Sequence, residues 1–296
     1  MTYVMGIDFG SMASKAVILD ENQKIVSSSV VMKGAVSEKG VALAIKEALE
    51  QAGLQISDIA RTVSTGYGRR KLDIVDRSIT EITCHARGAI HLFPECRTVI
   101  DIGGQDSKVI LVDSKGFVQQ FAMNDRCAAG TGQFLETLSR AMELELDDVG
   151  ELSLTSTKDV TVSSMCTVFA ETEVISLLAV GKQKPDILAG VHKATAGRVS
   201  GMVQRVGIRE PVAMTGGVSR NIGMVRALES VLNLKLMVSP NSQIAGALGA
   251  ALYAWSDARG DKVLFERDLV LERQGVVKPE PQKCNSDCAT NNNSVN

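Results

Sequence analysis

The sequence of 296 residues has no surplus of basic side chains and no long apolar run. Its 32 lysine and arginine residues stand against 34 acidic ones, for a net charge of −2. Broad binding of nucleic acid is therefore not expected, because neutralising phosphates needs a basic surplus. The longest apolar runs have about the length of a strand, too short for a helix that spans a bilayer. The first residues, MTYVMGIDFG, lack the charged and apolar regions of a signal peptide. We therefore expect a cytoplasmic protein.

The six cysteines include no CxxC pair, and no disulfide framework is expected in a protein that is not exported. Cys84 lies on an expected helix and Cys96 in a loop, and both are typical of small buried core residues. Cys284 and Cys288 lie in the polar C-terminal stretch PEPQKCNSDCATNNNSVN. We expect this stretch to be a flexible tail whose cysteines take no part in a metal site.

The most informative feature of the sequence is an internal repeat. The stretch GIDFGSMASKAVILDENQKIV, from Gly6, returns as IDIGGQDSKVILVDSKGFV, from Ile100. Each copy predicts an apolar strand that ends in aspartate, a glycine and serine turn, a second strand, a polar turn and a third strand. At one constant offset the repeat aligns Ile7 with Ile100, Asp8 with Asp101, Gly10 with Gly103, Ser14 with Ser107, Lys15 with Lys108, and Asp20 with Asp113.

Apolar residues spaced three and four apart predict helices, and short apolar runs between them predict strands. The expected helices cover residues 41–54, 79–93, about 130–143, 169–181, 185–207, 219–233 and 243–257, and the expected further strands cover 60–66, 211–217 and 235–239. This alternation predicts an α/β fold of two related halves, with helices on both faces of mixed sheets. The expected division is a first half, 1–95, a second half, 96–260, and the tail, 261–296.

The repeated turns suit a negatively charged ligand, because each presents backbone N–H groups without large side chains. Each first strand ends in an acid, Asp8 or Asp101, and such carboxylates hold Mg²⁺ directly or through water. A third turn in MTGGVSRN, at Gly216 and Gly217, ends a strand and opens a helix, a suitable place for a nucleoside. One such turn alone is typical of an ordinary β-hairpin. Two in register, with the third, predict a polyphosphate site in a cleft between the halves.

Side chains beside the first two turns have expected roles as well. The hydroxyl groups of Ser11 and Ser14 and the ammonium group of Lys15 are expected to contact phosphate. Gln105 lies where a side chain would orient an attacking water. With Asp8 and Asp101, it completes the predicted catalytic set.

At these turns the sequence resembles known proteins. GIDFGSMASK, DIGGQDSK and MTGGVSRN are similar to the two phosphate motifs and the adenosine motif of the superfamily that contains actin, Hsp70 chaperones and sugar kinases. The longer stretches STGYGRRKL, TEITCHARG, MNDRCAAGTGQFLE, SSMCTVFAETEVISLL and GALGAALYA resemble the ATP-dependent activators (component A) of 2-hydroxyacyl-CoA dehydratases. These activators belong with the ATPase subunits of benzoyl-CoA reductase. The resemblance covers about residues 3–258 and implies two ribonuclease-H-like halves around an ATP cleft.

The resemblance also implies which residues line the ATP site. They are Ser11, Met12, Ala13, Ser14, Lys15, Gly103, Gly104, Gly216, Gly217, Ser219 and Gln243. Met12 departs from the threonine that is common at this turn, so a contact from that hydroxyl is missing while the backbone N–H remains.

Cys127 and Cys166 are the candidate metal ligands. Each is expected shortly before a helix, where the positive end of the helix dipole favours a thiolate. Lone cysteines in apolar surroundings are more often core residues, and the residues alone leave this alternative open. A [4Fe–4S] cluster takes four thiolates, and two chains around a two-fold axis supply four. The resemblance implies one such cluster bridging a homodimer.

The function implied is ATP-driven electron transfer. A ferredoxin or flavodoxin would reduce the cluster, and a separate iron–sulfur dehydratase (component D) would receive the electron. Alternatives are an activator of benzoyl-CoA reductase or of another double-cluster reductase, a small-molecule kinase of the same superfamily, and an ATP-regulated binding protein. His85, His91 and His192 are interpreted as residues of helix surfaces or core edges. Glu171 and Glu173 are expected just inside a helix start.

Overall fold

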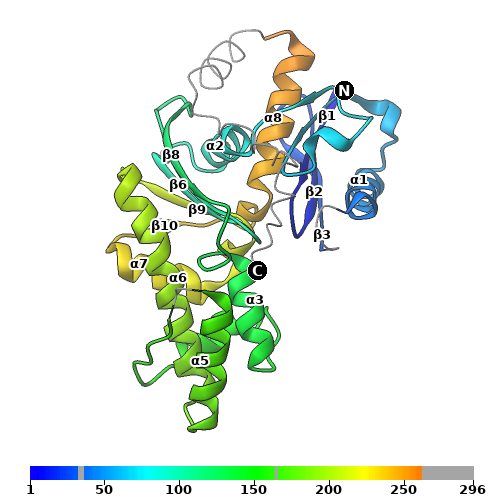
Figure 1. Cartoon of the computed structure of the whole chain (residues 1–296). Helices are drawn as coiled ribbons and strands as arrows, with labels where there is room; N and C mark the ends of the chain where they lie inside the picture. The colour runs from blue at the N-terminus through cyan, green and yellow to red at the C-terminus, as the bar shows by residue number, and fades with distance from the viewer. Residues whose placement is uncertain (33–36, 164–165, 262–296) are drawn as a thin grey trace, which may run out of the picture. The chain divides into compact units, whose positions relative to one another are not determined.

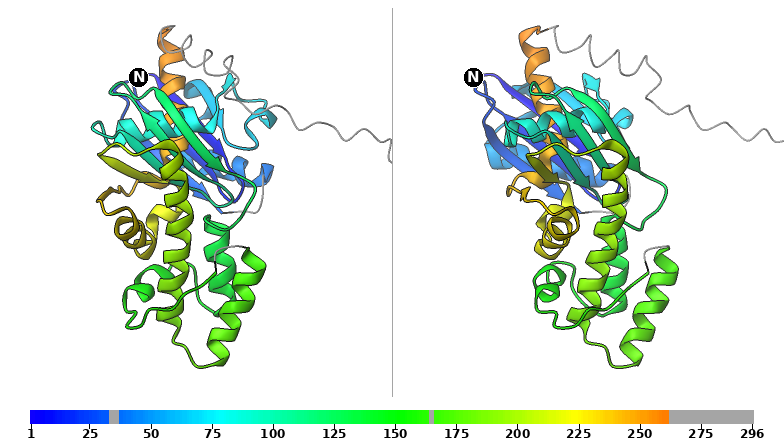
Figure 2. Two further views of the ribbon diagram at one scale, coloured as in Figure 1. Left: turned by 60° about the vertical axis from the view of Figure 1, so that its left-hand side comes forward. Right: turned by 90° about the vertical axis from the view of Figure 1, so that its left-hand side faces the viewer.

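Two five-stranded sheets with the same strand pattern form the framework of the chain (Figures 1 and 2). The computed structural model describes residues 1–32, 37–163 and 166–261. The first sheet has the order β3-β2-β1-β4-β5, and the second has the order β8-β7-β6-β9-β10. The strands are β1 (Tyr3–Phe9), β2 (Ser14–Leu19), β3 (Ile25–Val31), β4 (Ile59–Thr65), β5 (Arg77–Ser78), β6 (Thr98–Ile102), β7 (Ser107–Val112), β8 (Val118–Asn124), β9 (Val212–Thr215) and β10 (Leu236–Met237).

The sequence repeat forms equivalent parts of the two sheets. β1 pairs antiparallel with β2, so that Asp8 lies opposite Lys15, and β6 pairs in the same way with β7, so that Asp101 lies opposite Lys108. The third strand of each copy pairs antiparallel with the second. A parallel strand, β4 or β9, completes the other side of the first strand. The predicted order of strands in each copy is therefore confirmed.

The helices agree with the predicted α/β class. They are α1 (Glu38–Ala52), α2 (Glu81–Leu92), α3 (Gly132–Ala141), α4 (Val149–Leu154), α5 (Thr167–Ala179), α6 (Lys184–Val206), α7 (Ile222–Leu232) and α8 (Ala245–Arg259), with short 3₁₀ turns η1 (Ile56–Asp58), η2 (Arg69–Lys71), η3 (Gly217–Arg220) and η4 (Ser242–Ile244). The sequence patterns missed α4, because six residues are too few to show a helical period. The predicted helix 219–233 divides into η3 and α7, because the Asn221 side chain caps α7 by accepting from the backbone N–H of Met224.

Helices α2 and α8 lie between the two sheets (Figure 1). α8 packs on the first sheet, where the carbonyl oxygen of Ala247 occupies the place of a Cβ atom on Gly6. α2 packs on the second sheet, in a core that includes Ala86, Ala89 and Ile110. The two helices also touch one another, and Gly88 and Gly249 leave room for that crossing. Each half of the chain therefore supplies the helix that covers the sheet of the other half.

The largest apolar core surrounds α6 in the second half. It joins side chains of the second sheet to those of α3, α5 and α7, and Figure 2 shows α6 running from the sheet into the group of helices below it. The predicted boundary near residue 95 follows the repeat and stays a prediction, since α2 and α8 pack across it. Residues 1–259 form one contact unit. The predicted tail, with Cys284 and Cys288, lies outside the described residues except for residue 261. Within the described ranges, no helix combines the length and apolarity that crossing a membrane requires.

Candidate functional site

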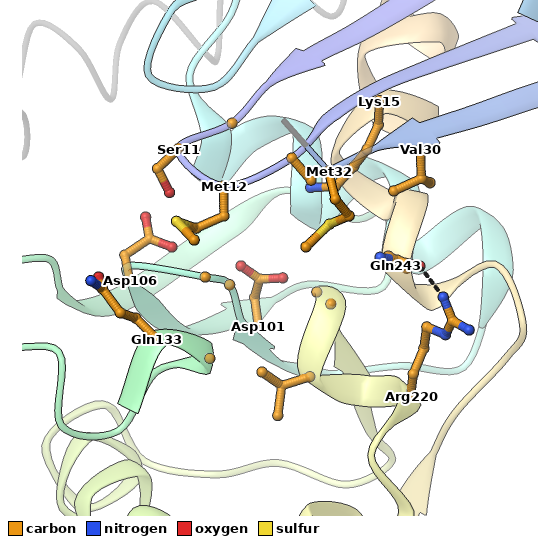
Figure 3. Close-up of a pocket in the computed structure, with 18 of the residues that line it drawn as sticks. Ser11, Met12, Lys15, Val30, Met32, Asp101, Asp106, Gln133, Arg220 and Gln243 are labelled. Carbon is orange, nitrogen blue, oxygen red and sulfur yellow. Dashed lines mark hydrogen bonds between the residues drawn. The ribbon is translucent and has the colours of Figure 1, made fainter. Parts of the chain in front are cut away.

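A cavity of about 550 Å³ opens where the three glycine turns meet. Figure 3 shows Met12, Met32 and Lys15 on one side of it and Asp101 and Gln133 on the other. Of the residues predicted from the sequence, the cavity brings together Asp8, Ser11, Met12, Ala13, Lys15, Asp101, Gly103, Gly104, Gly216, Gly217 and Gln243. Ser14, Gln105 and Ser219 are not among the lining residues. The predicted roles of all these residues in binding or catalysis stay predictions.

The first turn carries an ion pair that faces the cavity. Lys15 Nζ lies 2.7 Å from Asp8 Oδ2, and 13% of the lysine side chain stays exposed. Burial alone would lower the pKa of Lys15, but the Asp8 carboxylate raises it, so this lysine keeps its charge. Ser14, by contrast, is buried at the start of β2. The first turn thus offers one ammonium group and the Ser11 hydroxyl to a ligand.

The second turn has the same Asp–Lys pair in a more crowded setting. Lys108 Nζ lies 3.3 Å from Asp101, 3.0 Å from Glu81 and 2.8 Å from Asp106. The Thr215 hydroxyl donates to Asp101 Oδ1 over 2.9 Å, and His85 Nδ1 lies 3.1 Å from the same oxygen. Every group of this cluster is at least largely buried.

The charges in this cluster stabilise the ionised forms of Asp101, Lys108 and His85. Burial alone would raise the pKa of Asp101, yet His85 and Lys108 hold it well below its usual range. Burial alone would lower the pKa of Lys108, but the three surrounding carboxylates raise it. The pKa of His85 is also raised, because Asp101 outweighs the effect of burial. Burial raises the pKa of Glu81, with Lys108 opposing it.

Glu81, His85 and Asp106 are cavity residues that the sequence patterns did not indicate. His85 was interpreted as a helix-surface or core-edge residue; the surface position is wrong, since its side chain is buried on α2 and lies 3.1 Å from Asp101 of the second sheet. The same interpretation of His192 is wrong, because its side chain is buried on α6 against the loop before α7. The repeat could have indicated Asp106, which precedes the repeated serine. Glu81 and His85 lie on a helix, and only packing directs them to the cavity.

Four carboxyl groups line the cavity, those of Asp8, Glu81, Asp101 and Asp106, beside the ammonium groups of Lys15 and Lys108 and the imidazole of His85. Carboxylate oxygens suit a divalent cation, and Mg²⁺ prefers oxygen ligands. Among the described residues no group of three or more His, Cys, Asp or Glu side chains is arranged to hold a metal by itself. These residues therefore fit Mg²⁺ that also takes ligands from phosphate oxygens and water.

Met12 and Gln105 occupy the same position in the two copies of the repeat and touch each other. Gln105 Nε2 lies 3.8 Å from the Met12 sulfur, and the Met12 side chain covers Gly104 so closely that no Cβ would fit there. The first two glycine turns thus touch each other through the thioether side chain of Met12.

The third turn lies against the second. Gly216 has a φ of 85°, and a Cβ on it would lie 2.8 Å from Asp101 Oδ1, so only glycine fits. The Ser219 hydroxyl donates to the carbonyl oxygen of Gly216 over 2.7 Å and so shapes the turn. Arg220 and Gln243 meet at 3.4 Å at the edge of the cavity (Figure 3).

The two candidate metal ligands lie away from this cavity, in segments that head helices. Cys166 is the N-cap of α5 and Cys127 precedes Thr131, the N-cap of α3. Both are partly exposed and neither is in a disulfide, whereas Cys84 and Cys96 are buried, as predicted.

The segment after Cys127 is attached to the second phosphate turn. The backbone N–H groups of Gly132 and Gln133, at the start of α3, donate to the carbonyl oxygens of Gly103 and Gly104 over 2.8 and 2.7 Å. The segment before Cys166 is held from α5, because Glu173 Oε2 accepts from the backbone N–H of Ser163 at 2.5 Å. α5 begins at Thr167 and has no acid in its first turn, so the prediction that Glu171 and Glu173 lie just inside the helix start is wrong.

Comparison with known proteins finds relatives that match most of the chain. The chain is 50% identical over 257 residues to an activator of lactoyl-CoA dehydratase from Anaerotignum propionicum, covering 87% of this chain and 99% of the relative. The crystal structure of (R)-2-hydroxyglutaryl-CoA dehydratase component A from Acidaminococcus fermentans superposes with a TM-score of 0.85 at 49% identity, over 88% of this chain and all of the other. The activator of 2-hydroxyisocaproyl-CoA dehydratase from Clostridium difficile, with bound ADPNP, also gives 0.85, at 43% identity, over 94% and 99%.

A likeness of fold alone extends further. A glucokinase of the ROK family from Streptomyces griseus gives a TM-score of 0.52 at 13% identity, over 85% of this chain and 99% of the other, so the predicted fold class, shared with sugar kinases, is confirmed. The sequence model of the BadF/BadG/BcrA/BcrD ATPase family matches residues 5–254. The chain therefore belongs to the BadF/BadG/BcrA/BcrD ATPase family.

Proposed function

We propose that this protein is an ATP-dependent reductive activator of an iron–sulfur 2-hydroxyacyl-CoA dehydratase. The observation that carries the proposal is its 50% identity, over 87% of its length, to an activator of such a dehydratase. The separation of a polyphosphate cavity from two partly exposed cysteines supports it, because a plain kinase has no use for the second feature.

ATP would bind with its phosphates between the first two turns. Lys15 and Ser11 line that space from the first turn, and Gly103 and Gly104 line it from the second. Mg²⁺ would be held by phosphate oxygens and, through water, by Asp8 and Asp101. Gln105, at the edge of the second turn, would orient the attacking water once Met12 releases it. The nucleoside would lie by Gly216, Gly217 and Gln243.

Cys127 and Cys166 would hold a [4Fe–4S] cluster together with the same two residues of a second chain. The described part of one chain offers no third or fourth ligand beside them, and the two thiols are partly exposed, as ligands shared between chains must be. When bound, such a cluster supplies one-electron transfer at low potential. The partner dehydratase would be the acceptor, and a ferredoxin or flavodoxin would be the donor, in the cytoplasm.

The surface next to Cys166 suits a second copy of the chain. Val168, Phe169 and Ile175 on α5 are 66%, 68% and 53% exposed, and exposed apolar side chains in such a group mark interaction surfaces. They begin two residues after the cysteine. A two-fold axis beside α5 would bring the four thiols together and cover these side chains.

The test is an anaerobic assay of iron and acid-labile sulfide on the purified full chain, with its mass in solution. The expected result is about four irons per dimer, the content of one [4Fe–4S] cluster. Cys127→Ser and Cys166→Ser should each abolish iron binding while ATP hydrolysis persists, and Cys84→Ser is the matched control at a buried cysteine. A metal-free monomer that hydrolyses ATP even after anaerobic reconstitution would contradict the proposal.

A further inference from the structure

Helix α6 (Lys184–Val206) touches three functional segments within nine residues of its length. Gly190 lies against the carbonyl of Val160, in the segment that leads to Cys166. His192 meets Asn221 at the end of the third glycine turn. The Cβ of Arg198 lies 3.2 Å from the place of a Cβ on Gly130, in the loop after Cys127. One rigid element therefore contacts the nucleotide side of the cavity and both cysteine segments.

The direction of the hydrogen bond between His192 and Asn221 is fixed by the other partner of Asn221. Asn221 Oδ1 accepts from the backbone N–H of Met224, so its other side-chain atom, Nδ2, faces His192 Nε2 at 3.1 Å. An amide nitrogen only donates, so Nε2 must accept and the proton of the neutral imidazole must lie on Nδ1. Burial lowers the pKa of His192 to about 4, which agrees with a neutral ring. Asn221 itself lines the cavity.

The surroundings of His192 favour a functional role for this contact over simple core packing. His192 is 1% exposed, and its Nδ1 has no hydrogen-bond partner among the described residues. A buried donor without a partner is costly. Gly223 lies so near that a Cβ there would be 2.8 Å from the His192 ring, so the loop and the helix are closely fitted. An apolar side chain in this place would fill the space without that cost, but it would not bind Asn221.

The beginning of α6 is joined to the Cys166 side by hydrogen bonds as well. Asp186, buried in the first turn of α6, accepts from the backbone N–H groups of Thr157 and Lys158 over 2.8 and 2.9 Å and from the Ser156 hydroxyl over 3.0 Å. Val160 and Val162, which follow, pack in the core around α6. A shift of α6 along its axis must therefore move residues 156–162.

We infer that α6 transmits nucleotide binding to the two cysteine segments, and that His192 is the positioning residue that ties this helix to the nucleotide loop. The inference rests on the proposed function, in which those segments hold the cluster. In this arrangement, nucleotide on Asn221 changes the position of the loop, the loop moves His192, and α6 moves the segments at Gly190 and Arg198 together. The accessibility of the cysteines and of any bound cluster then depends on the nucleotide.

The experiment compares His192→Leu with His192→Gln, whose side-chain oxygen can accept from Asn221, and with Gln204→Ala, an exposed control on the same helix. The reduced holoprotein is mixed with an iron chelator, with and without a non-hydrolysable ATP analogue, and the rate of iron loss is measured. In the unchanged chain we expect nucleotide to alter this rate about tenfold or more, within the usual range of coupling between sites. His192→Leu should reduce the effect to less than about twofold, with iron content unchanged and nucleotide affinity within about threefold. His192→Gln and Gln204→Ala should keep it.

A full nucleotide effect in His192→Leu would overturn the inference and leave the proposed function standing. Absence of iron from the unchanged chain would instead overturn the proposed function. In that case alkylation rates of Cys127 and Cys166 in the metal-free chain, with and without the analogue, still test the coupling.

Hydrogen exchange in the unchanged chain gives a second test that needs no variant. Nucleotide should alter protection in α6 and in residues 157–163, as well as in the loop 216–221. A change confined to the loop would overturn the inference.

Discussion

The two copies of the repeated turn share sequence, register and an Asp–Lys pair, yet they differ in what surrounds that pair. In the first copy Lys15 has one partner, Asp8, and remains partly exposed to the cavity. In the second, Lys108 is buried among three carboxylates, and Asp101 also meets His85 and Thr215. The same strand–turn–strand unit therefore leaves its lysine partly exposed to the cavity in one copy and buries it among acids in the other.

The helix beside each turn accounts for most of this difference, and Asp106, which stands where the first copy has Ala13, adds a carboxylate from the turn itself. α8 presents Gly246 and small neighbours near Asp8, and these add no charge. α2 presents Glu81 and His85 to the second turn. The lesson is that a repeat fixes the backbone and the first ion pair, while the covering helix decides whether the lysine is available to a phosphate group. Four predictions follow the comparison from the largest effect to the smallest.

Removing the lysine of the second turn should cost the most stability. Lys108→Met leaves three buried carboxylates without their common cation, and removing one partner of a buried ion pair costs about 3–5 kcal/mol. Lys15→Met should cost no more than about 1–2 kcal/mol, because one carboxylate beside an open cavity is left unpaired. Denaturant unfolding of both variants measures the difference. Equal losses of unfolding free energy in the two variants would show that the two lysines stabilise the fold equally, against this prediction.

The lysine of the first turn should matter more for turnover. Lys15→Met removes the ammonium group that faces phosphate, and loss of such a group lowers the rate about 100-fold or more. Lys15→Arg is the matched control, since it keeps the charge. Steady-state ATP hydrolysis at saturating nucleotide, with circular dichroism to verify folding, is the measurement. A Lys15→Met variant that hydrolyses ATP at an unchanged rate would assign phosphate binding to the second turn.

The two buried histidines should respond to pH with opposite signs. The raised pKa of His85, in the second cluster, means that it adds stability below its unfolded pKa of about 6.5, which is lost as pH rises through the folded value. The pKa of His192 is lowered to about 4, so its stability is present above about pH 6.5 and is lost as pH falls towards 4. The loss for His192 is about 2–3 kcal/mol. The unfolding free energy of the unchanged chain minus that of His192→Gln, measured from pH 7 to 4.5, should fall with pH. A difference that stays flat would mean that His192 is not held neutral.

The smallest effect concerns the position at which the two turns meet. Met12→Thr restores a hydroxyl to the first turn and removes the thioether that touches Gln105. Nucleotide affinity should rise about threefold, the scale of one exchanged hydrogen bond, with stability changed by less than about 1 kcal/mol. Met12→Leu, which keeps the volume, serves as the control and should leave affinity near that of the unchanged chain. Isothermal titration with ADP measures the nucleotide affinities of both variants, and denaturant unfolding measures their stability. A weaker affinity in Met12→Thr would show that Met12 itself contacts the nucleotide.

Much of this protein is determined by its sequence alone. The constant offset of the repeat specifies the strands and the opposed Asp–Lys pairs, because alternating apolar runs and glycine turns act over a few residues. The long motifs around Cys127, Cys166 and the three turns specify the family. Helix positions also follow from local spacing, apart from the short α4 and the start of α7, where a side-chain cap decides.

Only the tertiary structure decided which distant side chains meet. Glu81 and His85 have ordinary helical neighbours in the sequence, and they join Lys108 and Asp101 because α2 packs on the sheet of the other half. His192 likewise gains Asn221 only because α6 lies beside α7. Such contacts join residues that are far apart in the chain and depend on how helices cross, where small residues such as Gly88 and Gly249 allow close approach. Local patterns act along the chain, whereas burial and charge pairing act across it.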